Sequence, residues 1–190
     1  MVDSPRPPSP AGDALVRIEI RDYDPAWPDL AARALDEVRA ALPGLLTEAE
    51  HVGSTAVPGL AAKPVIDLMV ATDDLDAVRA TEEALHRAGY RRIETGMRQR
   101  LFYRREGEPV GHHLHVVTTA SWPTRNERLL RDHLRRHPSD RQAYARLKRD
   151  LAAAGHDRDA YTRAKTVLIQ RMVDDARDAL GLPRVDVWEE

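Results

Sequence analysis

A glycine–serine pair followed by a single carboxylate in an apolar segment is the part of this sequence best suited to chemistry. Gly53 and Ser54 lie among small residues, where backbone N–H groups can approach an anion without hindrance from a Cβ atom. Asp67 follows inside the apolar run 65–70, where an unpaired carboxylate would cost roughly several kcal/mol. The pattern predicts that Gly53 and Ser54 hold a phosphate and that Asp67 binds Mg²⁺ or another divalent cation, with a plain tight turn as the alternative.

A histidine-rich segment supplies a second candidate group. Because side chains alternate along a strand, His113 and His115 share one face and His112 points to the other. Two imidazoles on one face can bind a transition metal or act as acid and base near neutral pH. We predict Asp67, His113 and His115 as catalytic and metal-binding residues, and a hydrogen-bonded core histidine is the alternative.

Basic side chains are concentrated in the middle of the chain. Residues 91–149 contain 15 Lys and Arg against 6 Asp and Glu, whereas residues 1–90 contain 8 against 16. Such a region can attract a phosphorylated ligand, although solvated helix faces would have the same composition. Arg98 and Arg100 can share one face at the start of the predicted strand 99–105. A guanidinium group suits phosphate recognition, so we predict that both bind the ligand, with a solvated surface role as the alternative for each.

The elements that must position these residues follow from periodicity and turn signals. Alternation of apolar and charged residues predicts a strand at 16–20. Asp24 and Pro25 predict the start of a helix that ends at Pro43-Gly44. A short strand leads to Val52, and the nearly continuous apolar run at 65–70 is typical of a central strand buried on both faces.

The second half of the chain is predicted to add a hairpin and then helices. Asp73 and Asp74 cap a helix that runs to about Ala88. The segments 99–105 and 113–118 flank a turn and predict the hairpin. After Pro123 the pattern is helical, with breaks near Pro138 and Gly155. The predicted fold class is therefore α/β (α+β), a mixed β-sheet flanked by helices with a C-terminal helical part.

Composition limits the class of protein. The 190 residues fit one domain, which we place at 15–182 between a disordered proline-rich tail at 1–14 and a C-terminal tail at 183–190. The chain has no cysteine, a net charge of −2 and no apolar run near the roughly 20 residues that span a bilayer. We expect a cytoplasmic protein with a small anionic or phosphorylated ligand, and neither membrane nor nucleic acid as partner.

The sequence resembles the GrpB family along nearly its whole length. The match is densest at 51–68 and continues through 23–27, 112–116 and 131–138. It also includes Tyr144, Lys148, Tyr161 and Lys165. The resemblance implies the nucleotidyltransferase-like superfold. It also adds Lys63, Arg131, Lys148 and Lys165 to the predicted ligand-binding residues.

The sequence departs from the active members of that superfold in one respect. These carry two carboxylates spaced Asp-x-Asp, but either Val65 or Met69 stands where the partner of Asp67 would be. Three hypotheses follow from the resemblance. The protein is a nucleotidyltransferase-like enzyme acting on a nucleotide or another phosphorylated molecule, a non-catalytic ligand-binding module, or the same fold using histidine acid–base chemistry.

Overall fold

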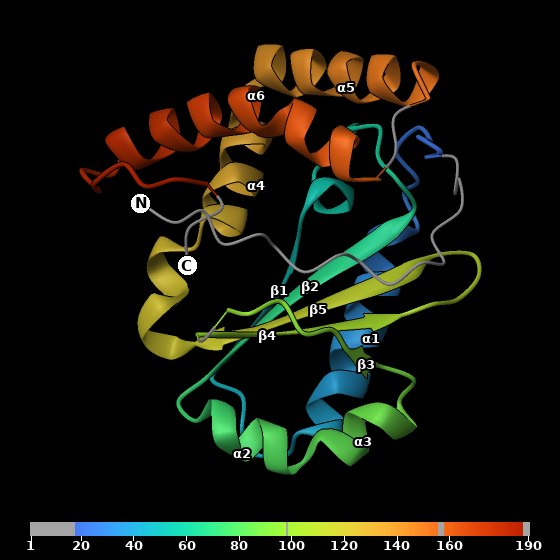
Figure 1. Cartoon of the computed structure of the whole chain (residues 1–190), viewed down its shortest axis with the longest axis vertical. Helices are drawn as coiled ribbons and strands as arrows, with labels where there is room; N and C mark the ends of the chain where they lie inside the picture. Colours follow the sequence, from blue (N-terminus) through green and yellow to red (C-terminus); the bar gives the residue numbers. More distant parts are fainter. Residues whose placement is uncertain (1–17, 98, 156–157, 188–190) are drawn as a thin grey trace, which may run out of the picture.

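The fold is built on a mixed β-sheet, seen in a computed structural model that describes residues 18–97, 99–155 and 158–187 (Figure 1). Within these residues the strand order is β1-β2-β5-β4-β3. Only β2 and β5 run parallel to each other, and the other neighbours are antiparallel. The strands are β1 (Glu48–Val52), β2 (Val65–Thr72), β3 (Arg91–Arg92), β4 (Arg100–Arg105) and β5 (Gly111–Thr118).

The centre of the sheet is the strand that the apolar run predicts. β2 lies between β1 and β5, and its residues from Leu68 to Thr72 are all buried. Its register with β5 places Asp67 directly opposite His113. A central position buries both faces of a strand, which explains why β2 carries so few polar side chains.

One face of the sheet is covered by the helices of the first half of the chain. These are α1 (Trp27–Ala41), α2 (Leu75–Ala80) and α3 (Glu82–Arg87). The apolar stripe of α1, including Trp27, Ala34 and Val38, is buried in a core shared with Ile66 and Leu114. The helix begins at Trp27, two residues after the predicted Pro25, and its N-cap is Ala26 rather than Asp24. The side chain of Asp24 instead accepts a hydrogen bond from the backbone of Ala26 at 2.8 Å, in the turn before the helix.

The C-terminal helices lie over the other face, at the top of Figure 1. They are α4 (Asn126–Arg136), α5 (Pro138–Ala153) and α6 (Arg158–Asp178), and the 3₁₀ turn η2 (Thr119–Thr124) leads into them from β5. A second core joins them to the loop after β1, through residues such as Val57, Leu134 and Met172. The predicted mixed sheet with a C-terminal helical part is confirmed.

Three local predictions differ from the structure. Residues 18–20 form no strand, and the segment contributes only the bridge between Arg21 and Ala62. The helix predicted from Asp74 divides at Thr81, whose hydroxyl bonds the carbonyls of Ala77 and Val78. The two-residue strand β3 was not predicted, because so short a strand has no periodicity to recognise.

Several predictions concern residues outside the described ones. The predicted tail at 1–14 and Arg98 lie outside them, and the domain limits stay predictions. Of the helices formed by described residues, none is both long and apolar enough to cross a bilayer.

Candidate functional site

The centre of the candidate site is a carboxylate–imidazole pair on the two parallel strands. Nδ1 of His113 lies 3.0 Å from Oδ1 of Asp67. Ionised Asp67 can only accept, so Nδ1 of His113 carries the hydrogen and donates it. In a neutral ring this leaves Nε2, on the far side of the imidazole, with its lone pair free to take a proton. The strand register thus fixes the orientation of the His113 imidazole.

His115 is held in the opposite tautomer by an arginine. An N–H of Arg100 contacts Nδ1 of His115, and an arginine can only donate, so Nδ1 must be the acceptor. The hydrogen of the neutral ring is then on Nε2, which lies 3.9 Å from Oδ1 of Asp67. Burial, and next the charge of Arg100, lower the pKa of His115 to about 4, so the ring is neutral at pH 7. Glu127 binds the same arginine at 3.0 Å.

The pKa of Asp67 reflects these two histidines. Burial alone would raise it, but hydrogen bonds from His113 and His115 hold the pKa of Asp67 below its ordinary value of 3.8. The carboxylate is therefore ionised at neutral pH. The hydrogen bond from His113 explains how an apolar strand tolerates the carboxylate that the sequence marks as anomalous.

Gly53 is required by its close approach to Asp67. Its backbone φ is +72°, a conformation that residues with a Cβ rarely adopt. A Cβ built on Gly53 would lie 2.2 Å from Oδ2 of Asp67. The glycine of the Gly-Ser pair therefore makes room for the carboxylate of Asp67. Its predicted approach to a phosphate stays a prediction.

Ser54 begins the 3₁₀ turn η1 (Ser54–Ala56) and meets a lysine from α5. Nζ of Lys148 donates to its Oγ at 3.0 Å. The loop is held in place by Thr55, which bonds the ring of His51 at 2.9 Å and the carbonyl of Val65 at 3.1 Å. These contacts fix the Gly-Ser loop beside the end of β2.

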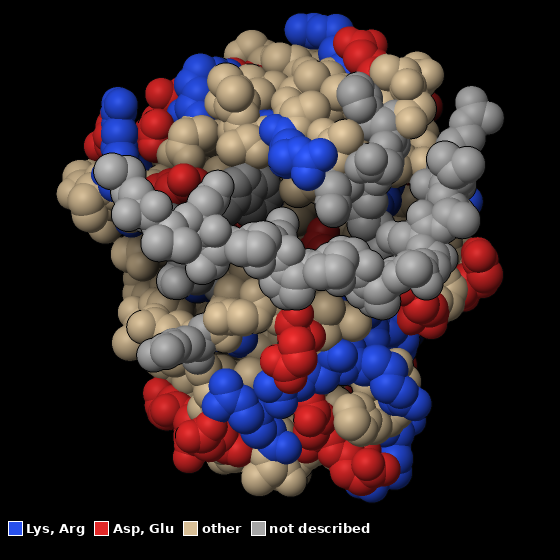
Figure 2. All heavy atoms as spheres, in the orientation of Figure 1, with Lys and Arg blue, Asp and Glu red and all other residues tan. Residues whose placement is uncertain are grey.

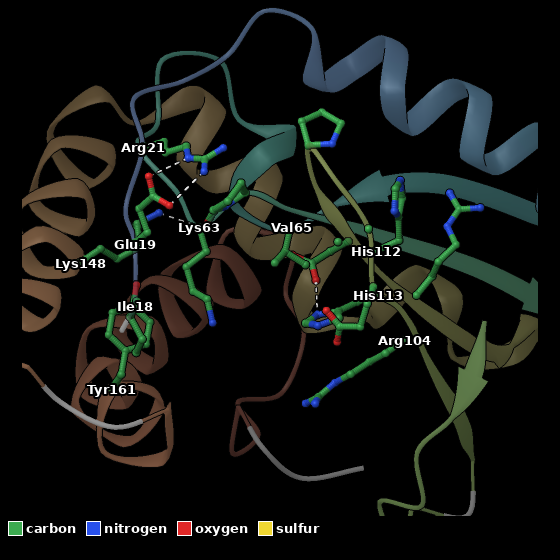
Figure 3. Close-up of a pocket in the computed structure, with 18 of the residues that line it drawn as sticks. Ile18, Glu19, Arg21, Lys63, Val65, Arg104, His112, His113, Lys148 and Tyr161 are labelled. Carbon is green, nitrogen blue, oxygen red and sulfur yellow. Dashed lines mark hydrogen bonds and ion pairs between the residues drawn. The ribbon is translucent and has the colours of Figure 1, made fainter. Parts of the chain in front are cut away.

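Two lysines bring positive charge to this region, although burial removes most of the water that would solvate their ammonium groups. Lys148 is 2% exposed, and burial, followed by the charge of Lys165, lowers its pKa well below 10.5. Burial, and then the charge of Lys63, lower the pKa of Lys165 to about 8. Their ammonium groups lie 4.4 and 4.2 Å from the ring centres of Tyr144 and Tyr161. Figure 3 shows Lys148 and Tyr161 on the helical side, across an open space from His113 and Arg104.

Two cavities meet at Asp67 and His113. The first, here the cationic cavity, has a volume of about 540 Å³, and its lining has more basic than acidic residues. The basic ones are Arg21, Lys63, Arg104, Arg105, Lys148 and Lys165, and the acidic ones are Glu19, Asp67, Glu106 and Glu108. The second, here the apolar cavity, has a volume of about 440 Å³ and is lined by residues such as Val52, Phe102, Leu130, Leu134 and Ile169. Both are within the range of small-molecule sites. A hollow between the helical part and the sheet is visible in Figure 2.

The structure brings together most of the predicted site residues. Six of them line the cationic cavity, namely Ser54, Lys63, Asp67, His113, Lys148 and Lys165. Gly53, Arg100 and His115 line the apolar cavity.

Arg131 reaches the wall of the apolar cavity but is engaged elsewhere. It is 7% exposed and binds Glu50 at 2.6 Å, Asp132 at 2.8 Å and the carbonyl of His51 at 3.0 Å. These contacts use its guanidinium to join α4 to β1. That Arg131 also contacts a ligand stays a prediction.

Glu127 and Phe102 line the apolar cavity and were not among the predicted site residues. Glu127 looks in the sequence like an ordinary acid in the first turn of a helix, and Phe102 like a core residue of the hairpin. Phe102 lies edge-on to His113, with ring centres 5.2 Å apart. The only available signal was that Phe102 is the single phenylalanine of the chain.

A metal ion is the cofactor that the sequence implies, so the donor set must be compared with what a metal needs. Donor atoms of Asp67, His113 and His115 lie within 4.8 Å of one another. Mg²⁺ prefers oxygen ligands, and this cluster offers one carboxylate and two imidazoles. A metal on Nε2 of neutral His115 would require a hydrogen on Nδ1, where Arg100 already donates. The cluster therefore does not fit a metal while Arg100 is in place.

Comparisons with known proteins agree with the resemblance noted above. The family described as GrpB protein matches residues 17–175. A UPF0157 protein of Pseudomonas aeruginosa is 38% identical over 197 aligned positions, covering 97% of this chain and 80% of that protein. The crystal structure of conserved protein GrpB from Enterococcus faecalis superposes with a TM-score of 0.79 at 28% identity, covering 86% of this chain and 99% of the other. The predicted fold class is confirmed.

A further relative is a longer protein. A dephospho-CoA kinase of Mycobacterium tuberculosis is 34% identical over 152 residues, which cover 75% of this chain but 37% of that protein. The similarity therefore concerns one part of the kinase chain.

Proposed function

We propose that this chain, which belongs to the GrpB family, binds a phosphorylated small molecule in the cationic cavity and transfers a group from it with the Asp67–His113 pair as acid and base. One observation carries the proposal. The almost fully buried ammonium group of Lys148 opens on the same cavity as Asp67 and His113. A cationic cavity with an oriented imidazole at its end suits transfer chemistry on an anion.

The case for an anion rests on charge. A buried ammonium group is costly unless it has a charged partner. Among the described residues, Lys148 donates only to the neutral hydroxyl of Ser54, and Lys165 has no carboxylate within ion-pair distance. A phosphate with two or more negative charges would compensate both lysines and strengthen their protonation.

The case for chemistry rests on the tautomer of His113. Because Nδ1 of His113 donates its hydrogen bond to Asp67, Nε2 of the same ring can take the proton of an attacking hydroxyl group. The lysines would stabilise charge on the phosphate oxygens during nucleotidyl or phosphoryl transfer. This mechanism assigns every step to side chains of the chain itself.

A non-catalytic ligand-binding module is the second candidate. The observation that favours it is that the cluster of Asp67, His113 and His115 contains one carboxylate, because phosphoryl transfer through two metal ions needs several oxygen ligands. In this case the same ligand would bind and remain unchanged.

A thermal-shift screen tests the ligand class that both functions share. The ligands would be nucleoside triphosphates, sugar phosphates, amino acids and coenzyme A derivatives, each with and without divalent metal ions. A ligand at 100 times its dissociation constant should add about 2.7 kcal/mol of stability. We expect stabilisation by phosphorylated ligands, and stabilisation by uncharged ligands alone would contradict the proposal.

Turnover is then measured for the ligands that stabilise the protein. We expect product release in the parent and a loss of about 100-fold or more in His113→Gln, because general base catalysis contributes that much. Binding without turnover in the parent would select the binding module. His86→Gln, on the distant helix α3, is the matched control.

A further inference from the structure

The apolar cavity has no role in the proposed function so far. It shares Ser54, Asp67 and His113 with the cationic cavity, so an occupant of either cavity reaches the same acid–base pair. Its volume of about 440 Å³ would hold a molecule of one or two rings. Two cavities that open on one reactive group are the arrangement that a two-substrate transfer requires.

Lys165 lines both cavities, and the phosphate proposed for the cationic cavity would compensate it, whereas the two arginines of the apolar wall are compensated within the protein. Arg100 binds Glu127 at 3.0 Å, and Arg131 binds Glu50 at 2.6 Å. A charged ligand would have to compete with these partners, whereas a neutral one would leave them intact. This differs from the cationic cavity, where Lys148 has a hydroxyl group as its hydrogen-bond acceptor.

The remaining wall is apolar and includes an aromatic ring beside the reactive histidine. Phe102 lies 5.2 Å from His113 and 5.0 Å from His115, ring centre to ring centre. Leu130 and Ile169 face the cavity from α4 and α6. A flat apolar molecule stacked on Phe102 would lie next to Nε2 of His113.

We propose that the apolar cavity is the acceptor site and that it takes a neutral alcohol with an apolar, ring-sized body. The inference rests on the proposed function. The hydroxyl proton of the acceptor passes to Nε2 of His113, and its oxygen forms a bond to the phosphorus of a phosphate ester or anhydride in the cationic cavity. The bond from that phosphorus to its leaving oxygen breaks, and the leaving group departs as an anion.

The test measures binding of a small aromatic alcohol by equilibrium dialysis. The probe is 2-naphthylmethanol, compared with its charged relatives 2-naphthoate and 2-naphthylmethylamine. Ile169→Trp and Leu130→Trp would fill the cavity, and Val167→Trp is the matched control, because Val167 lies on the same helix α6 and is 82% exposed. Inorganic pyrophosphate is the probe for the cationic cavity.

We expect the alcohol to bind more tightly than both charged relatives. The filled variants should bind it about tenfold more weakly or worse, since a filled pocket excludes its ligand, and Val167→Trp should match the parent. Phe102→Ala removes the ring without overfilling the cavity, so it still tests the acceptor site if a filled variant fails to fold. Equal alcohol binding in the parent, the folded filled variants and Phe102→Ala would overturn the inference.

The pyrophosphate probe keeps the two proposals separate. Pyrophosphate should bind the parent and the filled variants alike, since the cationic cavity is untouched. If the parent does not bind pyrophosphate but binds the alcohol more tightly than the filled variants do, the proposed function is refuted and the acceptor site is kept. Tighter binding of either charged relative would refute the neutral acceptor.

Discussion

At the residue scale, Gly53 is needed both for its backbone conformation and for its close approach to Asp67, and a comparison with Gly44 separates the two. Gly53→Ala introduces a Cβ that meets Asp67 and also strains a backbone with φ of +72°. Gly44 has nearly the same φ, +74°, but has open space where a Cβ would lie. We expect Gly44→Ala to lower the free energy of unfolding by about 1 kcal/mol and Gly53→Ala by about 2–4 kcal/mol. Equal losses in urea denaturation would mean that the approach to Asp67 has no cost.

The tautomer of His115 can be tested through metal binding. Arg100→Gln replaces a pure donor with a side chain whose carbonyl can accept a hydrogen from Nδ1 of His115. Nε2 would then be free to join Asp67 and His113 as a ligand. We expect Zn²⁺ affinity to rise about tenfold or more in calorimetric titration at pH 7.5, with the added affinity lost as the histidines are protonated. Tight Zn²⁺ binding by the parent would show that Arg100 does not set the tautomer.

At the element scale, the docking of α5 on the Gly-Ser loop buries the amino group of Lys148. Lys148→Met removes an ammonium group that is 2% exposed and bound to one hydroxyl group. We expect the free energy of unfolding at pH 7 to rise by about 1–3 kcal/mol, as it does when a poorly compensated buried charge is replaced by an apolar side chain. A loss of stability would show that the lysine is needed for packing.

The elements also show which features local sequence can predict. The apolar run at β2, the alternation at β5 and the approximate extent of α1 were predicted, because each is a periodic or positional signal within one segment. The pairing of Asp67 with His113 needed the family resemblance as well. The contact of Lys148 with Ser54 was not predictable, since the two residues are 94 positions apart and meet only when α5 packs over η1.

At the scale of the whole molecule, the uneven charge distribution becomes a set of long-range ion pairs. The basic middle of the chain pairs with the acidic first part, as in Arg105 with Glu37, Arg128 with Glu50 and Arg149 with Asp22. Solvated faces and ligand attraction were the two explanations that composition allowed. The fold uses many of these charges internally, whereas Lys148 and Lys165 form no ion pair with a carboxylate among the described residues.

Buried neutral histidines should make the whole molecule sensitive to acid. Burial, and next the charge of Arg105, lower the pKa of His112 to about 4 from 6.5. The unfolded chain therefore binds the proton first, and stability that is complete above pH 6.5 is lost as the pH falls towards 4. We expect His112→Gln to reduce the decrease in unfolding free energy between pH 7 and 4.5 by about 1–3 kcal/mol. A slope identical to that of the parent would contradict this assignment.

The central claim is that the cationic cavity binds phosphate through Lys148, and titration calorimetry with inorganic pyrophosphate tests it most directly. Arg149→Met is the control, since it removes the same charge from the neighbouring position of α5, where the side chain is 52% exposed. The account predicts one site in the parent and in Arg149→Met, and a loss of affinity of about 10- to 100-fold in Lys148→Met, because a hydrogen bond between charged groups contributes about 1.5–3 kcal/mol. Equal affinity in Lys148→Met and the parent, or no binding by the parent, would contradict it.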